Sequence, residues 1–187
     1  MNKLAKIYYN DPNLPTSPQV GENDKGVAHS YIEAYDELLS PYSNKDINFL
    51  EIGIQGGHSL TMWQKYFTRG SSIVGMDVQL KCYIHQRENI EVFIGDATDQ
   101  DVIEKFIPNR KFDVIIDDGS HRVDHQIKSF ELLYNLYLNE GGIYIIEDIE
   151  NIDKDKQLFL NLHPSCVIDD RRSIKNREDD VLIIYKK

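Results

Sequence analysis

Short apolar runs alternate along this chain with longer stretches in which apolar residues recur every three or four positions. Continuous apolar runs are typical of strands buried on both faces, and the wider spacing is typical of helices that bury one face. The runs predict strands at residues 47–52, 72–78, 90–95, 112–118, 143–148, 166–170 and 181–187. The spacing predicts helices at residues 27–40, from 59 onward, 82–87, 100–106, 123–138 and 154–163.

Strand and helix take turns until the last two strands, which follow each other directly. This order predicts an α/β fold: a doubly wound, mostly parallel sheet of seven strands that ends in a hairpin-like pair. Because 187 residues suit one core, residues 27–187 are expected to form a single domain. Residues 1–26 are expected to form an extended N-terminal arm, either a disordered leader or a flap over the site.

Charge and composition exclude several classes of protein. The net charge is −10, the pI is near 5.0, and the longest basic run is Arg171-Arg172. A nucleic-acid backbone is therefore not an expected partner. No apolar run approaches a membrane span, and the N-terminus lacks the apolar core of a secretion signal. With only Cys82 and Cys166, no disulfide framework is expected, so a cytoplasmic protein is predicted.

A glycine-rich turn follows the first strand and carries Glu51, Gly53, Gln55 and Gly57, with a helix starting near Ser59. Such a turn brings a ligand close to backbone N–H groups at a helix N-terminus. Its pattern, E-x-G-x-Q-G-G, does not meet the dinucleotide fingerprint G-x-G-x-x-G. It is similar to E/D-x-G-x-G-x-G, the first motif of class I S-adenosylmethionine (SAM) methyltransferases, with Gln55 at the middle glycine. A structural turn without a ligand is the alternative.

Carboxylates follow every strand from the first to the fifth: Glu51, Asp77, Asp96, Asp117-Asp118 and Glu147-Asp148. Ligands of a doubly wound sheet bind outside the carboxyl ends of its strands, so these acids predict a site at that edge. Asp77 is placed to accept both hydroxyls of a ribose. Asp96 and Ala97 are assigned to the adenine, and Asp117 to the same cofactor site. A ribose acid is common to NAD and SAM sites and therefore indicates an adenosyl ligand rather than a reaction.

Two acid pairs, Asp117-Asp118 and Glu147-Asp148, end neighbouring strands. Such strands lie about 4.8 Å apart, so the carboxylates can converge, and they would repel one another unless a cation lay between them. Oxygen ligands of this kind suit Mg²⁺ or Mn²⁺, whereas helix capping and plain loop roles are the alternative. His121 lies three residues after Asp118, where a base would be needed. His121 with His125 as a two-histidine metal site is a further alternative.

Five motifs together carry a resemblance to a known family: DKG-x-AHSY, LEIGI-x-GGHSL-x-MW, IVGMD, FDVIIDDGSH and GGIYIIED. They resemble the metal-dependent sugar O-methyltransferases of macrolide biosynthesis, the mycinamicin type, with a cephalosporin hydroxylase-like branch as a relative. The resemblance runs from about Asp24 to the C-terminus. It implies the class I methyltransferase fold with strand order 3-2-1-4-5-7-6 and SAM as methyl donor. It also implies Mg²⁺ held by Asp118, Glu147 and Asp148, with His121 as the catalytic base.

The leading hypothesis is a SAM- and Mg²⁺-dependent O-methyltransferase acting on a hydroxyl of a sugar or glycosylated small molecule, in a natural-product or surface-glycan pathway. A catechol-like phenol as acceptor is one alternative. A non-catalytic SAM-binding subunit and a nucleotide-dependent oxidoreductase are others. No nucleic acid or membrane is expected as a partner. The identity of the acceptor and the assembly of the chain into a homo-oligomer stay open.

Overall fold

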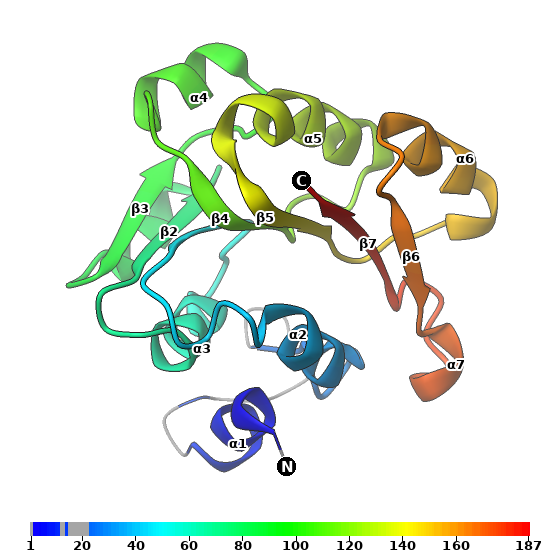
Figure 1. The fold of residues 1–187 in the computed structure, drawn as a ribbon, viewed down its shortest axis with the longest axis horizontal. Helices are drawn as coiled ribbons and strands as arrows, with labels where there is room; N and C mark the ends of the chain where they lie inside the picture. Colours follow the sequence, from blue (N-terminus) through cyan, green and yellow to red (C-terminus); the bar gives the residue numbers. More distant parts are fainter. Residues whose placement is uncertain (1, 12–13, 15–22) are drawn as a thin grey trace.

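A seven-stranded sheet forms the centre of the molecule, in the order β3-β2-β1-β4-β5-β7-β6 (Figure 1). The structure is a computed structural model that describes residues 2–11, 14 and 23–187. Strands β1 to β5 pair in parallel, and β7 is antiparallel to β5 and β6. The predicted sheet and its strand order are therefore confirmed. The strands are β1 (Asn48–Ile52), β2 (Ser72–Asp77), β3 (Ile90–Ile94), β4 (Phe112–Asp117), β5 (Leu138–Ile146), β6 (Val167–Asp170) and β7 (Val181–Lys186).

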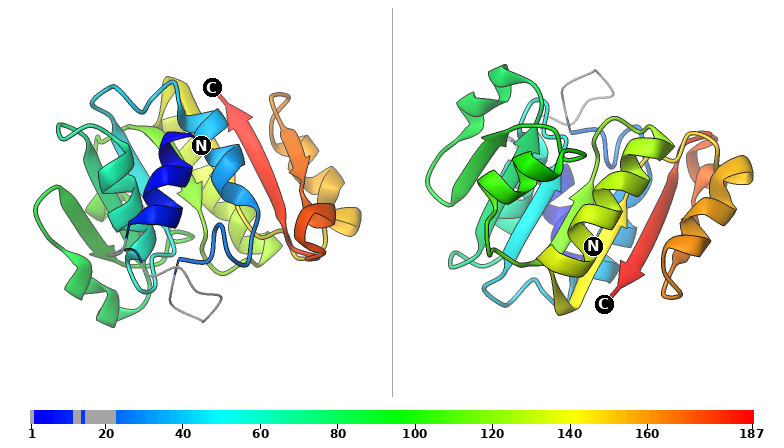
Figure 2. Two further views of the ribbon diagram at one scale, coloured as in Figure 1. Left: turned by 90° about the horizontal axis from the view of Figure 1, so that it is seen from below. Right: turned by 90° about the horizontal axis from the view of Figure 1, so that it is seen from above.

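Helices cover both faces of this sheet (Figures 1 and 2). One face carries α1 (Lys3–Asn10), α2 (Tyr31–Leu39) and α3 (His58–Tyr66). The other carries α4 (Gln100–Phe106), α5 (Val123–Tyr137) and α6 (Ile152–Leu162). Two short segments, η1 (Leu80–His85) and α7 (Arg172–Lys175), lie in the connections after β2 and β6. Within the described ranges, no helix has the length and apolar character needed to cross a membrane.

Two apolar cores lie between the sheet and its helices. Successive residues of β1 point to opposite faces, so Phe49 belongs to the core under α1, α2 and α3, and Leu50 to the core under α5 and α6. Trp63 fills the first core and Phe130 the second. Because both faces of the sheet are covered, its central strands consist of continuous apolar runs, as the sequence pattern predicts.

The N-terminal segment differs from the expected extended arm, because Lys3–Asn10 forms helix α1. Its buried residues, Leu4, Ala5 and Tyr8, recur at helical spacing and join the core under α2 and α3. The backbone N–H of Leu4 also donates to Asp36 of α2, at 2.8 Å. Docking onto α2 and α3 stabilises so short a helix, which is marginal by itself. The prediction of an extended arm is wrong for these residues, and residues 12–13 and 15–22 lie outside the described part.

Strand β5 begins earlier than the sequence pattern predicts. The sequence pattern predicts a strand from residue 143, after a helix at residues 123–138, but α5 ends at Tyr137 and β5 already starts at Leu138. The register between β4 and β5 shifts between the pairs Phe112–Leu138 and Val114–Ile143. The two glycines lie in this irregular part of the strand, where Gly141 has φ +76°. Glycine adopts this backbone conformation without the penalty that a side chain brings.

Strand register brings the loops after β1, β4 and β5 to the same level. Ile52 pairs with Asp117, and Asp117 pairs with Ile146. Backbone hydrogen bonds extend this alignment beyond the strands, from Asp118 N to Ile52 O and from Glu147 N to Asp117 O, both at 2.9 Å. The glycine turn, Asp118 and Glu147 therefore leave the sheet together, where ligands of this fold class bind.

Candidate active site

The glycine turn after β1 packs against the loop after β4. Gly53 has φ +79°, and a Cβ built on it would lie 1.9 Å from the backbone oxygen of Asp118. Gly57 has φ +67°, and a Cβ there would meet the ring of His85 at 2.4 Å. Both positions therefore require glycine for close packing as well as for backbone conformation.

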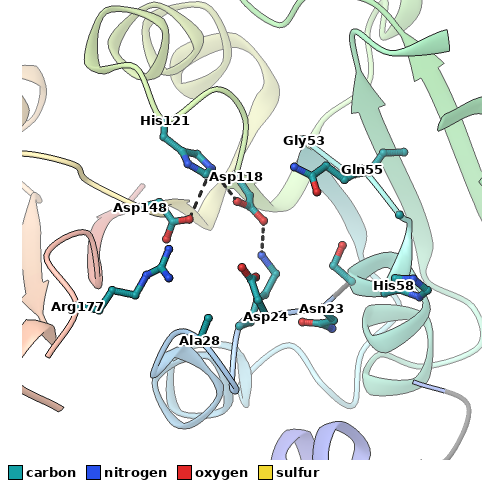
Figure 3. A pocket seen from close by; sticks show the side chains of 14 residues that line it. Asn23, Asp24, Ala28, Gly53, Gln55, His58, Asp118, His121, Asp148 and Arg177 are labelled. Carbon is teal, nitrogen blue, oxygen red and sulfur yellow. Dashed lines mark hydrogen bonds and ion pairs between the residues drawn. The ribbon is translucent and has the colours of Figure 1, made fainter. Parts of the chain in front are cut away.

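Gln55 occupies the position of the family's middle glycine and has a left-handed backbone with φ +34°. Its N–H donates to Asp77 Oδ2 at 3.0 Å, and its carbonyl oxygen accepts from Cys82 Sγ at 3.3 Å. The Nε2 atom of His85 lies 3.1 Å from the same oxygen. These contacts hold a conformation that is unfavourable for a side-chain-bearing residue. Gln55 borders two cavities. Figure 3 shows its side chain at the edge of one of them.

The first of these cavities, the cofactor cavity, has a volume of about 280 Å³ and is bordered by the ends of β1, β2, β3 and β4. Asp77 is largely buried there. Its Oδ2 accepts from the backbone N–H groups of Ile54 and Gln55, and its Oδ1 accepts from Gln79 N at 2.8 Å. Asp77 therefore closes the glycine turn as well as facing the cavity. The predicted cofactor residues that line it are Gly53, Gln55, Asp77, Asp96, Ala97 and Asp117.

Two further carboxylates of the cofactor cavity, those of Asp117 and Asp96, differ in charge. Burial raises the pKa of Asp117 to about 7. At Asp96 burial also acts to raise the pKa, but hydrogen bonds from the backbone N–H and hydroxyl of Thr98 outweigh it and lower the pKa. Asp96 is thus a permanent anion at the rim of the cavity at neutral pH, whereas Asp117 is close to its midpoint.

Two predicted cofactor residues have structural roles instead of lining the cofactor cavity. Glu51 is fully buried and accepts from Ser59 Oγ at 2.6 Å and Trp63 Nε1 at 3.2 Å. It borders neither cavity, and the same holds for Gly57. Ser59, on the first turn of α3, borders the second cavity only. Sequence position alone could not distinguish a carboxylate that faces a ligand from one that anchors the turn to α3.

The second cavity, which we call the acceptor cavity after the substrate expected there, has a volume of about 320 Å³ and shares Gly53, Gln55 and Asp118 with the first. Asp118, His121 and Asp148 converge on it from the loops after β4 and β5 (Figure 3). His121 Nε2 lies 3.3 Å from Asp118 Oδ1 and 3.6 Å from Asp148 Oδ2. One ligand atom from each residue lies within 4.8 Å of the others, a spacing that suits a single metal ion.

Glu147, the third residue of the expected metal set, points elsewhere. Its Oε1 accepts from Lys25 Nζ and from the hydroxyl of Tyr35, both at 2.5 Å. It belongs to a second group of potential ligands, formed with Glu51 and Asp118, and does not border the acceptor cavity. The structure therefore divides the expected set: Asp118 and Asp148 lie together beside His121, and Glu147 lies with Lys25.

Helix α2 and the residues before it position the acids after β5. The hydroxyl of Tyr31 donates to Asp148 Oδ1 at 2.7 Å, one helical turn from Tyr35, which donates to Glu147. His29 is buried, stacks on Tyr31 and has Nδ1 3.2 Å from Asp148 Oδ1. Asp148 itself has φ +55°, a conformation that costs about 1–3 kcal/mol in a residue with a side chain. These contacts hold the Asp148 carboxylate towards the acceptor cavity despite that cost.

The charges around His121 favour its protonated form. Burial acts to lower its pKa, but the hydrogen bond and charge of Asp118 and the charge of Asp148 outweigh it and raise the pKa of His121 to about 9. Burial together with the charge of Asp118 raises the pKa of Asp148 to about 7. A divalent cation between the two carboxylates would lower the pKa of Asp148, because it stabilises the ionised carboxylate, and would lower the pKa of His121, because it repels an imidazolium.

His125 and His121 border different cavities. It borders the cofactor cavity, and its Nδ1 lies 2.9 Å from Ser120 Oγ. His121 borders the acceptor cavity, and among the described residues no group of potential metal ligands contains both histidines. The structure therefore does not support the two-histidine metal site.

Sequence reasoning missed several residues that build the site. Tyr31 and Tyr35 lie in the helix predicted at residues 27–40, and both are fully buried, but their hydroxyls reach the acids after β5. Lys25 was noted only as part of the DKG motif. Arg177 points into the acceptor cavity from the loop before β7 (Figure 3). The spacing of Tyr31 and Tyr35, four residues apart, was the one available signal, because hydroxyls on a buried face need partners.

Comparison with known proteins finds relatives of one kind. The chain is 32% identical over 139 residues to 8-demethyl-8-alpha-L-rhamnosyl tetracenomycin-C 2'-O-methyltransferase of Streptomyces olivaceus, across 68% of this chain and 35% of that protein. It is 35% identical over 132 residues to demethylmacrocin O-methyltransferase of Streptomyces fradiae, across 66% of this chain and 33% of that protein. The chain is similar in sequence to these O-methyltransferases over about two thirds of its own length. It spans about a third of their length.

Solved structures show the same fold. The MycE methyltransferase of the mycinamycin pathway, solved with Mg, SAH and mycinamycin VI, superposes with a TM-score of 0.71 at 23% identity. The match covers 98% of this chain and 52% of that one. An O-methyltransferase from Bacillus cereus in complex with SAH matches with a TM-score of 0.62 at 19% identity, over 98% of this chain and 90% of that one. The chain therefore has the class I methyltransferase fold. No family model matches the chain.

Proposed function

We propose that this chain is a SAM-dependent, Mg²⁺- or Mn²⁺-dependent O-methyltransferase that acts on a hydroxyl of a sugar or glycosylated small molecule. One observation carries the proposal. The cofactor cavity and the acceptor cavity meet at Gly53, Gln55 and Asp118, so a donor in one can reach an acceptor in the other. The names of the curated relatives and the Mg and SAH bound by MycE support the choice of chemistry.

The residues of the cofactor cavity fit the adenosyl part of SAM. Asp77 Oδ1 accepts one hydrogen bond from the backbone and retains a lone pair for a ribose hydroxyl. Asp96 and Ala97 border the part of the cavity assigned to adenine. The carboxylates of Asp77 and Asp96 also suit a cationic ligand, and SAM carries a sulfonium. When bound, SAM supplies an electrophilic methyl group, and much of the catalysis is the positioning of that group.

The residues of the acceptor cavity fit a hard divalent cation. Asp118 and Asp148 offer carboxylate oxygens, which Mg²⁺ and Mn²⁺ prefer. A cation held there lowers the pKa of a hydroxyl that contacts it. Asp118 and Asp148 would orient that hydroxyl, and His121 Nε2, on the same side, would accept its proton. His121 must be neutral to do so, which the cation favours.

The lining of the acceptor cavity favours a sugar over a catechol-like phenol. The described residues that border it include Asn23, Asp24, Ser59 and Arg177, and no tryptophan, tyrosine or phenylalanine is among them. A flat phenol ring is usually held between apolar or aromatic side chains, whereas a sugar presents hydroxyls to charged and amide groups. A potential base beside the proposed cation site, His121, favours an enzyme over a subunit that only binds SAM.

Chelation provides a direct test of the proposed reaction. In a mass-spectrometric assay with SAM and a panel of glycosides and nucleotide-sugars, we expect a methyl gain that EDTA abolishes and Mg²⁺ restores. Calorimetric titration of SAM should be nearly unchanged by EDTA, because the cation is assigned to the acceptor cavity. Full turnover after exhaustive chelation would remove the cation from the mechanism, and tighter binding of NAD than of SAM would point to an oxidoreductase.

Asp77→Ala is expected to weaken SAM binding by about 1.5–3 kcal/mol, the usual loss for a hydrogen bond to a charged group. Because Asp77 also accepts from Ile54 and Gln55, the variant should unfold at a lower temperature than the wild type. Calorimetric titration measures the first effect and thermal denaturation the second. Asp99→Ala, which removes the N-cap of α4 outside the cofactor cavity, is the control and should lower stability without changing SAM affinity. Equal SAM affinity in Asp77→Ala and the wild type would contradict the ribose assignment.

A further inference from the structure

One arginine of the acceptor cavity has no part in the proposed reaction. Arg177 lies in the connection between α7 and β7 and borders the cavity, and its side chain is 39% exposed. Figure 3 shows it on the side opposite Gly53 and Gln55, where the acceptor cavity meets the cofactor cavity. Arg177 therefore faces a part of the acceptor that lies away from the methyl donor.

A neighbouring carboxylate fixes the direction of the Arg177 guanidinium. Arg177 Nε donates to Asp179 Oδ1 at 2.6 Å, and Nη2 donates to Asp179 Oδ2 at 3.0 Å. Within the described residues, Nη1 has no hydrogen-bond partner and Asp179 is the one ion-pair partner of Arg177. All N–H groups of a guanidinium lie in one plane, so this pairing holds the donors of Nη1 in a fixed direction. These donors are available to a ligand in the cavity.

The connection that carries Arg177 is anchored on both sides. Before it, the ammonium of Lys175 donates to three backbone carbonyl oxygens within residues 26–29. After it, the fully buried Asp180 accepts from Ser30 N at 3.1 Å and from Ser30 Oγ at 2.6 Å. A guanidinium on an anchored backbone loses little freedom when it binds a ligand, which suits a residue that selects the acceptor.

The other charges of the acceptor cavity leave room for an anion beside Arg177. Lys25, the other basic residue of the described lining apart from histidines, is buried and already donates to two carboxylates. The cation assigned to Asp118 and Asp148 balances the charges of these two acids. Asp24, the third acid of the lining, has a side chain that is 43% exposed, so solvent and salt screen its charge.

We propose that Arg177 is a specificity-determining residue that binds an anionic group, a carboxylate or a phosphate, on the acceptor sugar. Paired N–H groups of a guanidinium match the oxygen atoms of both groups. The hydroxyl that receives the methyl group contacts the cation, and the anionic group lies on the Arg177 side of the cavity. This inference rests on the proposed function and deepens it by naming the acceptor class: uronic acids and sugar phosphates, nucleotide-sugars included, ahead of neutral glycosides.

Sugar binding tests the inference separately from turnover. Calorimetric titration of the full chain, with SAH and Mg²⁺ present, compares D-glucuronate and D-glucose 1-phosphate with methyl α-D-glucoside, and the series is repeated with the galactose counterparts. At least one anionic sugar should bind about tenfold more tightly than its neutral counterpart. This is the lower end of the range for a hydrogen bond to a charged group, because Arg177 is partly exposed. The anion that binds more tightly identifies the carboxylate or the phosphate as the group recognised.

Arg177→Gln should bind the anionic and the neutral sugars with equal affinity, because it removes the charge that attracts the anion. Arg172→Gln is the matched control. Arg172 lies in the same connection and forms the same kind of paired contact, with Asp170, but it does not border the acceptor cavity. This control should keep the preference of the wild type for the anionic sugar.

The outcomes separate this inference from the proposed function. Equal binding of anionic and neutral sugars by the wild type, or no binding of either anion, would overturn the role of Arg177. A preference that persists in folded Arg177→Gln would also overturn it, since the cation would then hold the anion. Circular dichroism identifies an Arg177→Gln chain that does not fold, and Arg177→Lys then decides. Its preference should fall several-fold, because an ammonium lacks the planar pair of donors, and an unchanged preference would overturn the inference.

Turnover provides the remaining distinction. Methyl gain on neutral glycosides alone, at equal rates in the wild type and Arg177→Gln, would overturn this inference and leave the proposed function intact. A chain that does not bind SAM would contradict the proposed function, while the sugar titration still decides the role of Arg177.

Discussion

His121→Ala is expected to lower kcat by about 10²–10⁴-fold, the range typical of a general base. The Nε2 atom of His121 faces both carboxylates assigned to the cation. His29 also lies beside Asp148 but does not border the acceptor cavity. SAM affinity should be nearly unchanged, because His121 borders the acceptor cavity and not the cofactor cavity. Steady-state kinetics with saturating Mg²⁺ and a calorimetric SAM titration measure the two quantities.

His125→Ala is the matched control for this prediction. It removes an imidazole four residues away that borders the cofactor cavity, so any change should appear in the KM for SAM and not in kcat.

The rate of the wild type should rise with pH, because His121 must be neutral to act as the base. Since the carboxylates alone raise the pKa of His121 to about 9, a bound cation should shift that rise to lower pH. Near-normal kcat in His121→Ala would show that metal chelation alone activates the hydroxyl.

Asp148→Asn is expected to abolish most of the metal affinity. Loss of a group that merely orients a metal ligand costs about 10–100-fold in affinity, and loss of a ligand should cost at least that much. Turnover at limiting Mg²⁺ should fall with it, while SAM affinity stays constant. Mn²⁺ titration measures the affinity directly. Asp36→Asn is the control, because Asp36 is similarly buried but accepts from Leu4 N on the far side of α2.

The stabilising effect of the cation on the wild type should depend on pH, and Asp148→Asn should lose most of this effect. The pKa of Asp148 is raised to about 7 in the folded chain, whereas an ordinary aspartate has a pKa of about 4. The free energy of unfolding should therefore fall as the pH rises from about 4 towards 7. A divalent cation offsets this cost only where Asp148 is ionised. Mg²⁺ should therefore raise the melting temperature of the wild type more at pH 8 than at pH 5, and should raise that of Asp148→Asn much less. An equal Mg²⁺ effect in both chains would remove Asp148 from the cation site.

Much of the fold follows from local pattern. Continuous apolar runs identify the central strands because both faces of the sheet are covered, and the alternation with helices determines the parallel order. The start of β5 could not be predicted, since Gly141 and Gly142 end helices more often than they join irregular strands. Helix α1 was also missed, because its stability comes from docking onto α2 and α3 rather than from its own eight residues.

The candidate site was predictable where side chains follow directly from strand ends. Asp77, Asp96, Asp118 and Asp148 border the cavities as their positions after β2, β3, β4 and β5 indicate. The assignments of Glu51 and Glu147 depend on contacts that no local pattern encodes. Lys25 reaches Asp118 across 93 residues and Glu147 across 122, and only the folded chain shows that an ammonium already lies between these acids.

A crystal structure of the chain with SAH and Mn²⁺, with the ion located by anomalous scattering, tests the central claim most directly. The account predicts the ribose of SAH beside Asp77, one anomalous peak between Asp118 and Asp148, and His121 Nε2 facing the open side of that ion. A peak between Glu51, Asp118 and Glu147, or SAH outside the cavity bordered by Asp77 and Asp96, would contradict it.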